Sequence, residues 1–187
     1  MGGVTERLFV GIELDDDVRH GLAAHLATQL NGRRLPGKAV APASWHITLR
    51  FMGATEERQR DQVVAAISAE ADIAPFAIAF SGLGAFPGTT RAAVVWLGIA
   101  SGAASLERLA AVCESAAQRV GFAPEDRPFH PHLTLARVRP PRDVGSLVDQ
   151  VAAFPLRQPV SSVALFRSTL GRGGARYDVI DRVQLVA

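Results

Sequence analysis

The sequence contains a four-residue pattern twice: HITL, which begins at His46, and HLTL, which begins at His132. Each copy lies in a short apolar run that is typical of a β-strand. Side chains alternate between the two faces of a strand, so residues two apart point in the same direction. The histidine therefore shares a face with Thr48 in the first copy and with Thr134 in the second, while the hydrophobic residues point the other way.

Two such strands predict a groove that carries an imidazole and a hydroxyl on each side. One histidine can donate a proton while the other accepts one, which an in-line displacement at phosphorus requires. A single His-x-Thr on a strand is more typical of a solvated face. Two of the five histidines, however, lie in near-identical segments in opposite halves of the chain, so a duplicated half-site is the better interpretation. His46 and His132 are therefore the candidate catalytic pair.

Composition narrows the class of protein. The chain has 187 residues, of which 48% are hydrophobic, enough to bury a substantial core as one domain or as two intimate lobes. We find no apolar run long enough for a membrane span and no export signal, so we expect a cytoplasmic protein that does not bind a membrane. The net charge of +2 argues against wide non-specific binding along a duplex, while it allows binding to one phosphorylated end.

Hydrophobic spacing and turn residues predict alternating strands and helices without a flexible linker. Acidic residues at 15–17 suit the start of the first helix, Thr55 and Asp143 are candidate N-caps, and Pro140-Pro141 is expected to stop the second motif strand. A glycine-rich turn at residues 171–174 joins the last two strands. The fold class is therefore α/β or α+β, with two similar lobes that meet at a groove. The expected strands cover residues 7–14, 45–52, 76–86, 92–97, 132–138, 160–170 and 177–186, and the expected helices cover residues 18–30, 55–71, 104–120 and 143–154.

One segment has the spacing of a metal site. His130 and His132 are two residues apart on either side of a proline. No cysteine and no nearby cluster of carboxylates supports metal binding there, and the first motif has only one histidine. We therefore expect no metal.

Arginine is the remaining candidate for phosphate binding. Strand alternation places Arg50, four residues after His46, on the histidine face. Arg137 is five residues after His132, so strict alternation points it away from the groove unless the strand bulges or ends there. Periodicity alone therefore favours Arg50.

These residues resemble the 2H phosphoesterase superfamily, which is named for two His-x-Thr/Ser-x motifs. The closer resemblance is to its bacterial and archaeal RNA 2′,3′-cyclic phosphodiesterase branch, also called the LigT-like or 2′-5′ RNA ligase family. The resemblance covers nearly the whole chain, and the ordered set of motifs is highly specific. These motifs are RLFVGIEL (7–14), WHITLRFMG (45–53), LGAFP (83–87), VVWLG (94–98), RPFHPHLTLAR (127–137), LFRSTL (165–170) and GARYDVI (174–180).

The resemblance implies a bilobal α/β fold in which residues 1–187 form a single domain. Its two pseudo-symmetric halves, each with antiparallel strands and helices, place the motifs on opposite sides of a central cleft. The resemblance also implies an enzyme that needs no metal or other cofactor. We expect a monomer without an obligate protein partner. Its substrate would be an RNA 3′ end or a nucleotide that carries a 2′,3′-cyclic phosphate.

The resemblance also assigns roles to five residues. His46 would be the general acid that protonates the departing 3′ oxygen, and His132 the general base that activates water, so that a 2′-phosphate remains. Thr48 and Thr134 would hydrogen-bond the non-bridging phosphate oxygens. The family pattern places the phosphate-binding arginine at Arg137, which overrides the preference for Arg50 from alternation.

Three alternative functions remain open from the sequence. The same site can run in reverse and join a cyclic phosphate to a 5′-hydroxyl through a 2′-5′ bond. The substrate can instead be a small cyclic-phosphate nucleotide. A nucleotide- or RNA-binding module without catalysis is the third possibility, and the intact histidines and threonines argue against it.

Overall fold

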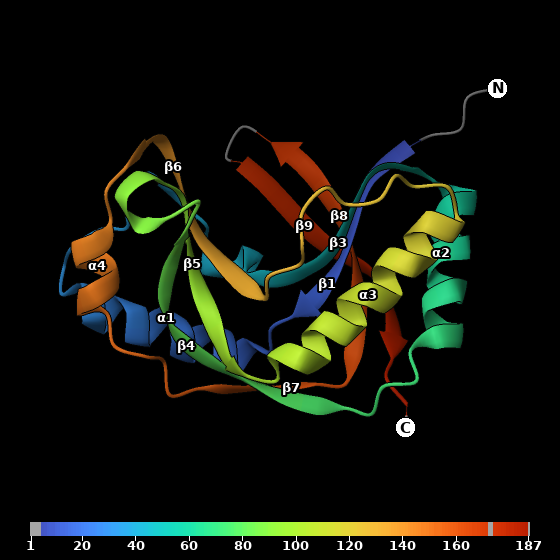
Figure 1. Ribbon diagram of the computed structural model, residues 1–187, viewed down its shortest axis with the longest axis horizontal. Helices are drawn as coiled ribbons and strands as arrows, with labels where there is room; N and C mark the ends of the chain where they lie inside the picture. The colour runs from blue at the N-terminus through green and yellow to red at the C-terminus, as the bar shows by residue number, and fades with distance from the viewer. Residues whose placement is uncertain (1–4, 172–173, 187) are drawn as a thin grey trace.

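The computed structural model describes residues 5–171 and 174–186, which form two antiparallel sheets with helices packed around them (Figure 1). The strands are β1 (Thr5–Glu13), β2 (Lys38–Ala39), β3 (His46–Glu56), β4 (Phe76–Phe86), β5 (Ala92–Ser101), β6 (His132–Arg142), β7 (Arg157–Val160), β8 (Ser162–Gly171) and β9 (Gly174–Gln184). The first sheet has the order β3-β1-β8-β9, and the second has the order β2-β6-β5-β4-β7. The two motif strands, β3 and β6, therefore belong to different sheets. This arrangement confirms the expected mixed fold of two antiparallel sheets with helices.

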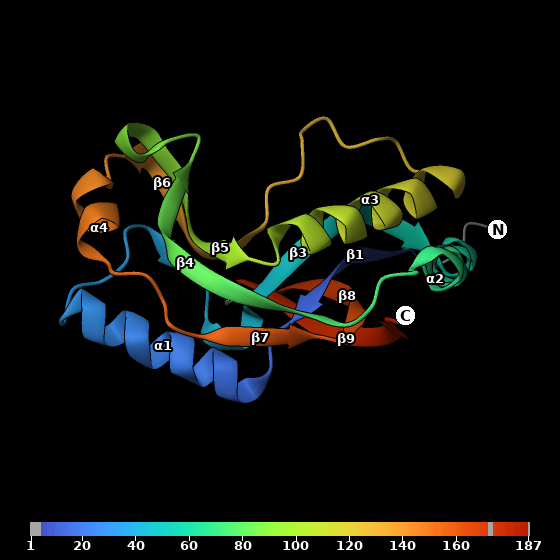
Figure 2. The same cartoon turned by 60° about the horizontal axis from the view of Figure 1, so that its bottom comes forward.

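Two of the helices follow a strand of one sheet and pack against the other half of the molecule. They are α1 (Asp16–Leu30), α2 (Glu57–Glu70), α3 (Ala103–Arg119) and α4 (Gly145–Gln150), with short 3₁₀ helices at Pro42–Ser44 and Thr89–Arg91. Helix α3 follows a strand of the second sheet, yet it contacts α2 and β3 of the first half (Figure 1). Helix α1 follows a strand of the first sheet but begins beside β7 of the second (Figure 2). In the part of the chain that the structure describes, no helix is long and apolar enough to cross a membrane.

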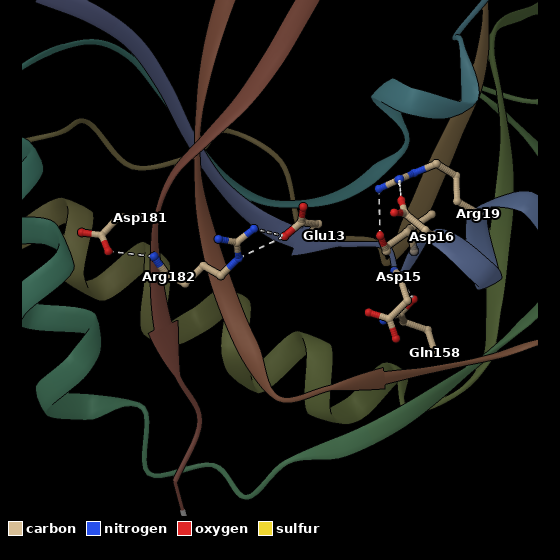
Figure 3. Close-up of polar contacts among 8 residues, drawn as sticks. Glu13, Asp15, Asp16, Arg19, Gln158, Asp181 and Arg182 are labelled. Atoms are coloured by element: carbon tan, nitrogen blue, oxygen red, sulfur yellow. Dashed lines mark hydrogen bonds and ion pairs between the residues drawn. The ribbon is translucent and has the colours of Figure 1, made fainter.

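Polar contacts fix the start of α1 against the second sheet (Figure 3). The backbone N–H of Asp15 donates to Oε1 of Gln158 in β7 at 3.0 Å, and the Gln158 side chain is buried. Close by, Arg182 of β9 forms an ion pair of 2.7 Å with Glu13 at the end of β1 (Figure 3). These contacts hold the outer strands of both sheets close to the segment that leads from β1 into α1.

The apolar core is continuous between the two sheets. Leu8 and Ile47 of the first sheet and Leu97 and Leu133 of the second belong to one cluster, and each is 0% exposed. The residues between the motif histidines and threonines therefore point into the core, as alternation predicts. Burial of this apolar face leaves the histidine and the threonine of each motif strand on the opposite face, away from the core.

Helix ends follow the expected chemistry in two places. Asn31 ends α1 with a φ of 46°, and Gly121 follows α3 with a φ of 98°. Both values lie in the left-handed region, where glycine and asparagine are the residues most easily accommodated. The predicted C-terminal boundaries of these two helices are therefore confirmed.

The predicted start of α2 is wrong. Strand β3 does not end near residue 52 but continues to Glu56, because its last residues pair with the beginning of β1. Thr55 is consequently a buried strand residue whose hydroxyl donates to the carbonyl oxygen of Gly53 at 3.1 Å. Glu56 is the N-cap instead, and it forms a reciprocal capping box with Gln59.

The prediction that Pro140-Pro141 stops the second motif strand is also wrong, because β6 continues to Arg142. A proline has no N–H to donate to a ladder, so it is confined to irregular or edge positions. The register between β6 and β5 jumps from Arg137 to Arg142, and both prolines lie within that irregular stretch. The strand therefore accommodates them without losing a regular ladder hydrogen bond.

Smaller differences involve short elements. Strand β2 has only two residues, and β7 precedes the strand expected from residue 160, so neither was predicted. The last helix is shorter than expected and spans Gly145–Gln150, although Asp143 does accept the backbone N–H of Gly145 at 2.7 Å. In the predicted turn at residues 171–174, residues 172 and 173 lie outside the described part, while the flanking glycines pair across β8 and β9.

Candidate active site

The two histidines are oriented in the same way by the backbone that precedes them. Nδ1 of His46 lies 2.8 Å from the carbonyl oxygen of Ser44, and Nδ1 of His132 lies 2.6 Å from that of His130. A carbonyl oxygen only accepts, so each Nδ1 carries the proton and donates it. In the neutral ring the lone pair is therefore on Nε2, and in His46 this atom lies 3.1 Å from Oγ1 of Thr48. In both imidazoles, Nε2 is therefore the nitrogen that is available for proton transfer.

Aromatic side chains surround His46. Its ring centroid lies 4.7 Å from that of Phe9, 5.4 Å from Phe166 and 4.8 Å from Tyr177. Phe9 and Phe166 are themselves stacked at 4.8 Å and belong to a small buried cluster of the first sheet. This packing removes water from one side of the imidazole and fixes its ring plane.

His132 has a related environment in the second sheet. Its ring lies 5.0 Å from Phe86 with perpendicular planes and 6.2 Å from Trp96. Phe86 occupies a position in its sheet equivalent to that of Phe166 in the first, since each lies two strands away from the motif strand and beside the histidine. The repeat therefore extends from the motif itself to an aromatic neighbour.

Both histidines have a depressed pKa. Burial lowers the pKa of His46 to about 4, against a raising effect of the hydrogen bond to Ser44, and the charges of Arg137 and His132 lower it further. Burial also lowers the pKa of His132 below 6.5, and His130 and Arg137 add to this effect. Both rings are therefore neutral at pH 7 in the free protein.

A bulge in each motif strand reverses the alternation. In β3 the ladder pairs Thr48 and Arg50 with consecutive residues of β1, so Leu49 is an extra residue. Leu49 and Arg50 are both buried, at 6% and 5% exposure, and the next outward side chain is Phe51. The residue that shares the histidine face after the bulge is thus Phe51 and not Arg50.

The second motif strand has the same bulge at the equivalent place. The ladder pairs Thr134 and Ala136 with consecutive residues of β5, which leaves Leu135 as the extra residue. Leu135 and Ala136 are both buried, and Arg137 is exposed on the side of the histidine and threonine. The bulge therefore brings Arg137 to the histidine face, where strict alternation did not place it.

Arg50 lies below the groove, so its expected position on the histidine face is wrong. Its guanidinium forms ion pairs with Glu114 of α3 and with Glu125, the latter at 2.7 Å. It also donates to the carbonyl oxygens of Phe51 and Ala123. These partners engage both terminal nitrogens of the guanidinium, so Arg50 links β3 to α3 and to the segment that leads into β6.

Two adjoining cavities contain the predicted residues. The first has a volume of about 370 Å³, and among its lining residues are His46, Thr48, Thr134 and Arg137. The second, of about 1120 Å³, is lined on one side by His132. Thr48 lines both cavities, so all five predicted residues face one continuous cleft between the two sheets.

The cleft also contains residues that the sequence reasoning missed. Phe51 lines both cavities, while Arg7, Arg139 and Tyr177 line the smaller one. Two of them carried a usable signal. Phe51 follows His46 by the same five positions that separate Arg137 from its histidine, and Arg139 is two residues beyond Arg137. Within residues 5–171 and 174–186, no group of three or more His, Cys, Asp or Glu side chains is placed to hold a metal ion.

Two sheets that each present a His-x-Thr strand to a shared cleft define a two-histidine phosphoesterase site. A family model described as the 2′-5′ RNA ligase superfamily matches residues 17–172, and the chain belongs to this family.

Relatives from archaea and bacteria match this chain over most of their length. The chain is 35% identical to the RNA 2′,3′-cyclic phosphodiesterase of Aeropyrum pernix over 171 residues, which cover 88% of this chain and 95% of the relative. It is also 35% identical to the protein of the same name from Thermus thermophilus, with 96% and 90% covered. The structure of Escherichia coli LigT complexed with 3′-AMP superimposes with a TM-score of 0.77 at 26% identity and covers 98% and 99% of the two chains.

Proposed function

We propose that this protein hydrolyses the 2′,3′-cyclic phosphate at the 3′ end of RNA and leaves a 2′-phosphate. The observation that carries the proposal is the matched pair of imidazoles, each held by a backbone carbonyl so that Nε2 faces one cleft. The names of the relatives support the substrate class, because each of the two is an RNA 2′,3′-cyclic phosphodiesterase. Both histidines come from one chain, so the site is complete in a monomer.

The proposed reaction uses the histidines in complementary roles. Nε2 of His132 accepts a proton from a water molecule, and the water oxygen forms a bond to phosphorus. The bond between phosphorus and the 3′ oxygen breaks on the opposite side, and Nε2–H of His46 donates its proton to that oxygen. His46 ends neutral and His132 ends protonated, and proton exchange with solvent restores the starting state.

Protonation of His46 depends on the substrate. In the free protein, burial holds the pKa of His46 near 4, which disfavours the acid form at neutral pH. A bound phosphodiester anion offsets the charge of Arg137 and favours the imidazolium, because an opposite charge nearby raises the pKa of a histidine. Binding of the anionic substrate therefore raises the pKa of His46 and produces the protonated acid that the reaction requires.

The remaining residues stabilise charge on phosphorus. The hydroxyls of Thr48 and Thr134 line the cleft beside Arg137 and point from opposite strands. In the transition state they hydrogen-bond the non-bridging oxygens, and the guanidinium adds a charge-assisted contact. A strained cyclic ester reacts readily, so this set is sufficient for the proposed chemistry without a metal ion.

The decisive experiment offers a short RNA with a 2′,3′-cyclic phosphate terminus and identifies the product by phosphorus NMR. We expect a 2′-phosphate. A 3′-phosphate would exchange the acid and base roles of His46 and His132, and absence of hydrolysis would refute the proposal. A double variant, His46→Ala with His132→Ala, prepared in the same way, controls for contaminating nuclease.

A second activity is favoured by the family to which the chain belongs. If a 5′-hydroxyl replaces water beside His132, the same steps join two RNA ends through a 2′-5′ bond, because the 5′ oxygen bonds to phosphorus as the 3′ oxygen leaves. Adding an RNA with a 5′-hydroxyl to the hydrolysis assay tests this directly. We expect a minor product with a 2′-5′ linkage, because water is far more concentrated than the RNA end.

A further inference from the structure

The smaller cavity contains more positive charge than one phosphate needs. Arg7, Arg137 and Arg139 all line it, and its lining includes no aspartate or glutamate. The larger cavity next to it has a mixed lining, which includes three glutamates and one arginine, and two of these glutamates pair with Arg50. A cleft lined by one sign of charge concentrates the electrostatic field and attracts ligands of the other sign. Anions are therefore drawn to the half of the cleft that contains His46.

Arg139 lies next to Arg137 on the face of β6 that lines the smaller cavity. The two residues lie on the same face of β6, and Val138 between them is 0% exposed. Side chains two apart on a strand are separated by about 6.6 Å. This spacing is similar to the separation of successive phosphates along an extended RNA strand, so two neighbouring phosphates can each meet one guanidinium.

Arg7 completes the cavity from the opposite wall. It extends from β1, and its guanidinium carbon lies 5.0 Å from the ring centroid of Phe51, which is 38% exposed. Among the ion pairs of residues 5–171 and 174–186, none involves Arg7, Arg137 or Arg139. Within the described residues, no carboxylate therefore neutralises these three guanidiniums.

The catalytic steps use only one of these arginines. The reacting phosphate is placed by the two histidines, the two threonines and Arg137, which leaves Arg139 and Arg7 without a role at that phosphorus. Leu170, near the tip of the hairpin between β8 and β9, also lines this cavity and is 72% exposed. The cavity thus reaches the protein surface beside Leu170.

We propose that Arg139, with Arg7 opposite, forms a second phosphate site that binds the internucleotide phosphate on the 5′ side of the terminal nucleoside. This inference rests on the proposed function and makes it more specific. The preferred substrate is a single-stranded RNA of two or more nucleotides, and a mononucleoside 2′,3′-cyclic phosphate is a poorer one because it lacks the second phosphate.

The test compares three substrates with one terminal nucleoside. They are a mononucleoside 2′,3′-cyclic phosphate, the dinucleotide with the same terminus, and that dinucleotide with a neutral methylphosphonate in place of the internucleotide phosphate. For the wild-type protein we expect a kcat/KM about tenfold higher for the dinucleotide than for the mononucleotide, from one charge-assisted contact. The methylphosphonate should remove this advantage, because it keeps the second nucleoside and loses the charge.

Variants then locate the contact. Arg139→Gln should bring the ratio of dinucleotide to mononucleotide kcat/KM close to one and make the variant insensitive to the methylphosphonate. Arg139→Lys should restore part of the ratio. Arg142→Gln is the matched control, because it removes an exposed arginine from the same strand that lines neither cavity. The dependence of log kcat/KM on log salt should also become shallower by about 0.7 in Arg139→Gln with the dinucleotide.

Several outcomes overturn the inference. A wild-type ratio near one means that no second phosphate is bound. An equal loss on both substrates in Arg139→Gln means that Arg139 acts on the reacting phosphate, and an equal change in Arg142→Gln means that only net charge matters. If the wild-type protein hydrolyses none of the three substrates, the proposed function fails and the second site fails with it.

Discussion

Strands β3 and β6 have the same design up to the bulge and differ immediately after it. Both place a histidine and a threonine in the cleft, and both bury an extra leucine at the bulge. After that leucine, β3 has Arg50 buried and Phe51 in the cleft, whereas β6 has Ala136 buried and Arg137 in the cleft. The repeat therefore supplies the pair of imidazoles. The two positions after the bulge determine which further side chain each motif strand places in the cleft.

The difference divides the two arginines between function and structure. In β6 the guanidinium of Arg137 is free in a cavity beside the threonines. In β3 the guanidinium of Arg50 is used by Glu114 and Glu125 under the cleft. At this position the first motif strand thus contributes an aromatic side chain to the cleft, and the second contributes a positive charge.

The largest expected effect tests what the two strands share. We predict that His46→Ala and His132→Ala each lower kcat/KM for a cyclic-phosphate RNA by at least about a hundredfold, because each removes one proton-transfer group. His20→Ala, at an exposed position of α1, is the control. Circular dichroism should report a folded protein in all three. Near-normal turnover in either motif variant would mean that the halves are not a catalytic pair.

The next effect tests where the strands differ. Arg137→Ala should lower kcat/KM by about ten- to a hundredfold, since a charge-assisted contact to phosphate contributes roughly 1.5–3 kcal/mol. Its free energy of unfolding should stay close to that of the wild type, because the side chain is exposed.

Arg50→Ala should show the opposite pattern. Its removal leaves two carboxylates without their buried partner, so the free energy of unfolding should fall by about 2 kcal/mol, a figure reduced for the partial exposure of both glutamates. Urea unfolding and kcat/KM at a temperature well below the transition measure both quantities. A larger loss of kcat/KM in Arg50→Ala than in Arg137→Ala would reverse the assignment.

A smaller effect concerns pH. The pKa values of His46 and His132 both lie below the ordinary 6.5 in the free protein. The kcat/KM profile reports the free protein, so its alkaline limb should lie below pH 6.5, while the kcat profile reports the complex. The bound phosphate raises the pKa of the acid, so the alkaline limb of kcat should lie at higher pH. If the alkaline limbs of the kcat/KM and kcat profiles coincided, the bound anion would not raise the pKa of His46.

Stability gives an independent check of the same shift. A histidine with a lowered pKa in the folded state binds more protons when the chain unfolds, so stability rises with pH in the window between the two values. For His46 this window runs from about 4 to 6.5, and the contribution is lost as the pH falls through it. The His46→Gln variant should lose less stability over this range than the wild-type protein does.

The smallest expected effect is that of chelation. The second half has His130 two residues before its motif histidine, His132, where the first half has Ser44 two residues before His46. We predict that EDTA leaves kcat/KM unchanged, because the protons come from imidazoles and the charge on phosphorus is met by Arg137. Loss of activity in EDTA with recovery on addition of a divalent ion would make His130 and His132 candidate ligands.

The sequence alone was sufficient for the part of the site that lies before the bulge. Two HxTL copies and a period of two place each motif histidine on the same strand face as its threonine. In the structure His46, Thr48, His132 and Thr134 all line the cleft. Local patterns were also enough for most strands and for the ends of α1 and α3. These features depend on neighbours in the chain, so they can be read from spacing and turn residues.

The family resemblance had named Arg137, but only the tertiary structure explains which side chains enter the cleft after the bulge. Whether Leu49 and Arg50 are both buried depends on the pairing of β3 with β1 and on carboxylates that come from α3 and the segment after it. A one-residue insertion in a ladder turns every later side chain to the other face, and no period in one strand reveals it. The same applies to the length of β6, whose Pro140-Pro141 falls where its partner strand makes no regular pair. The arginine in the cleft and the second basic position beside it thus depend on strand pairing, which is a property of the folded chain.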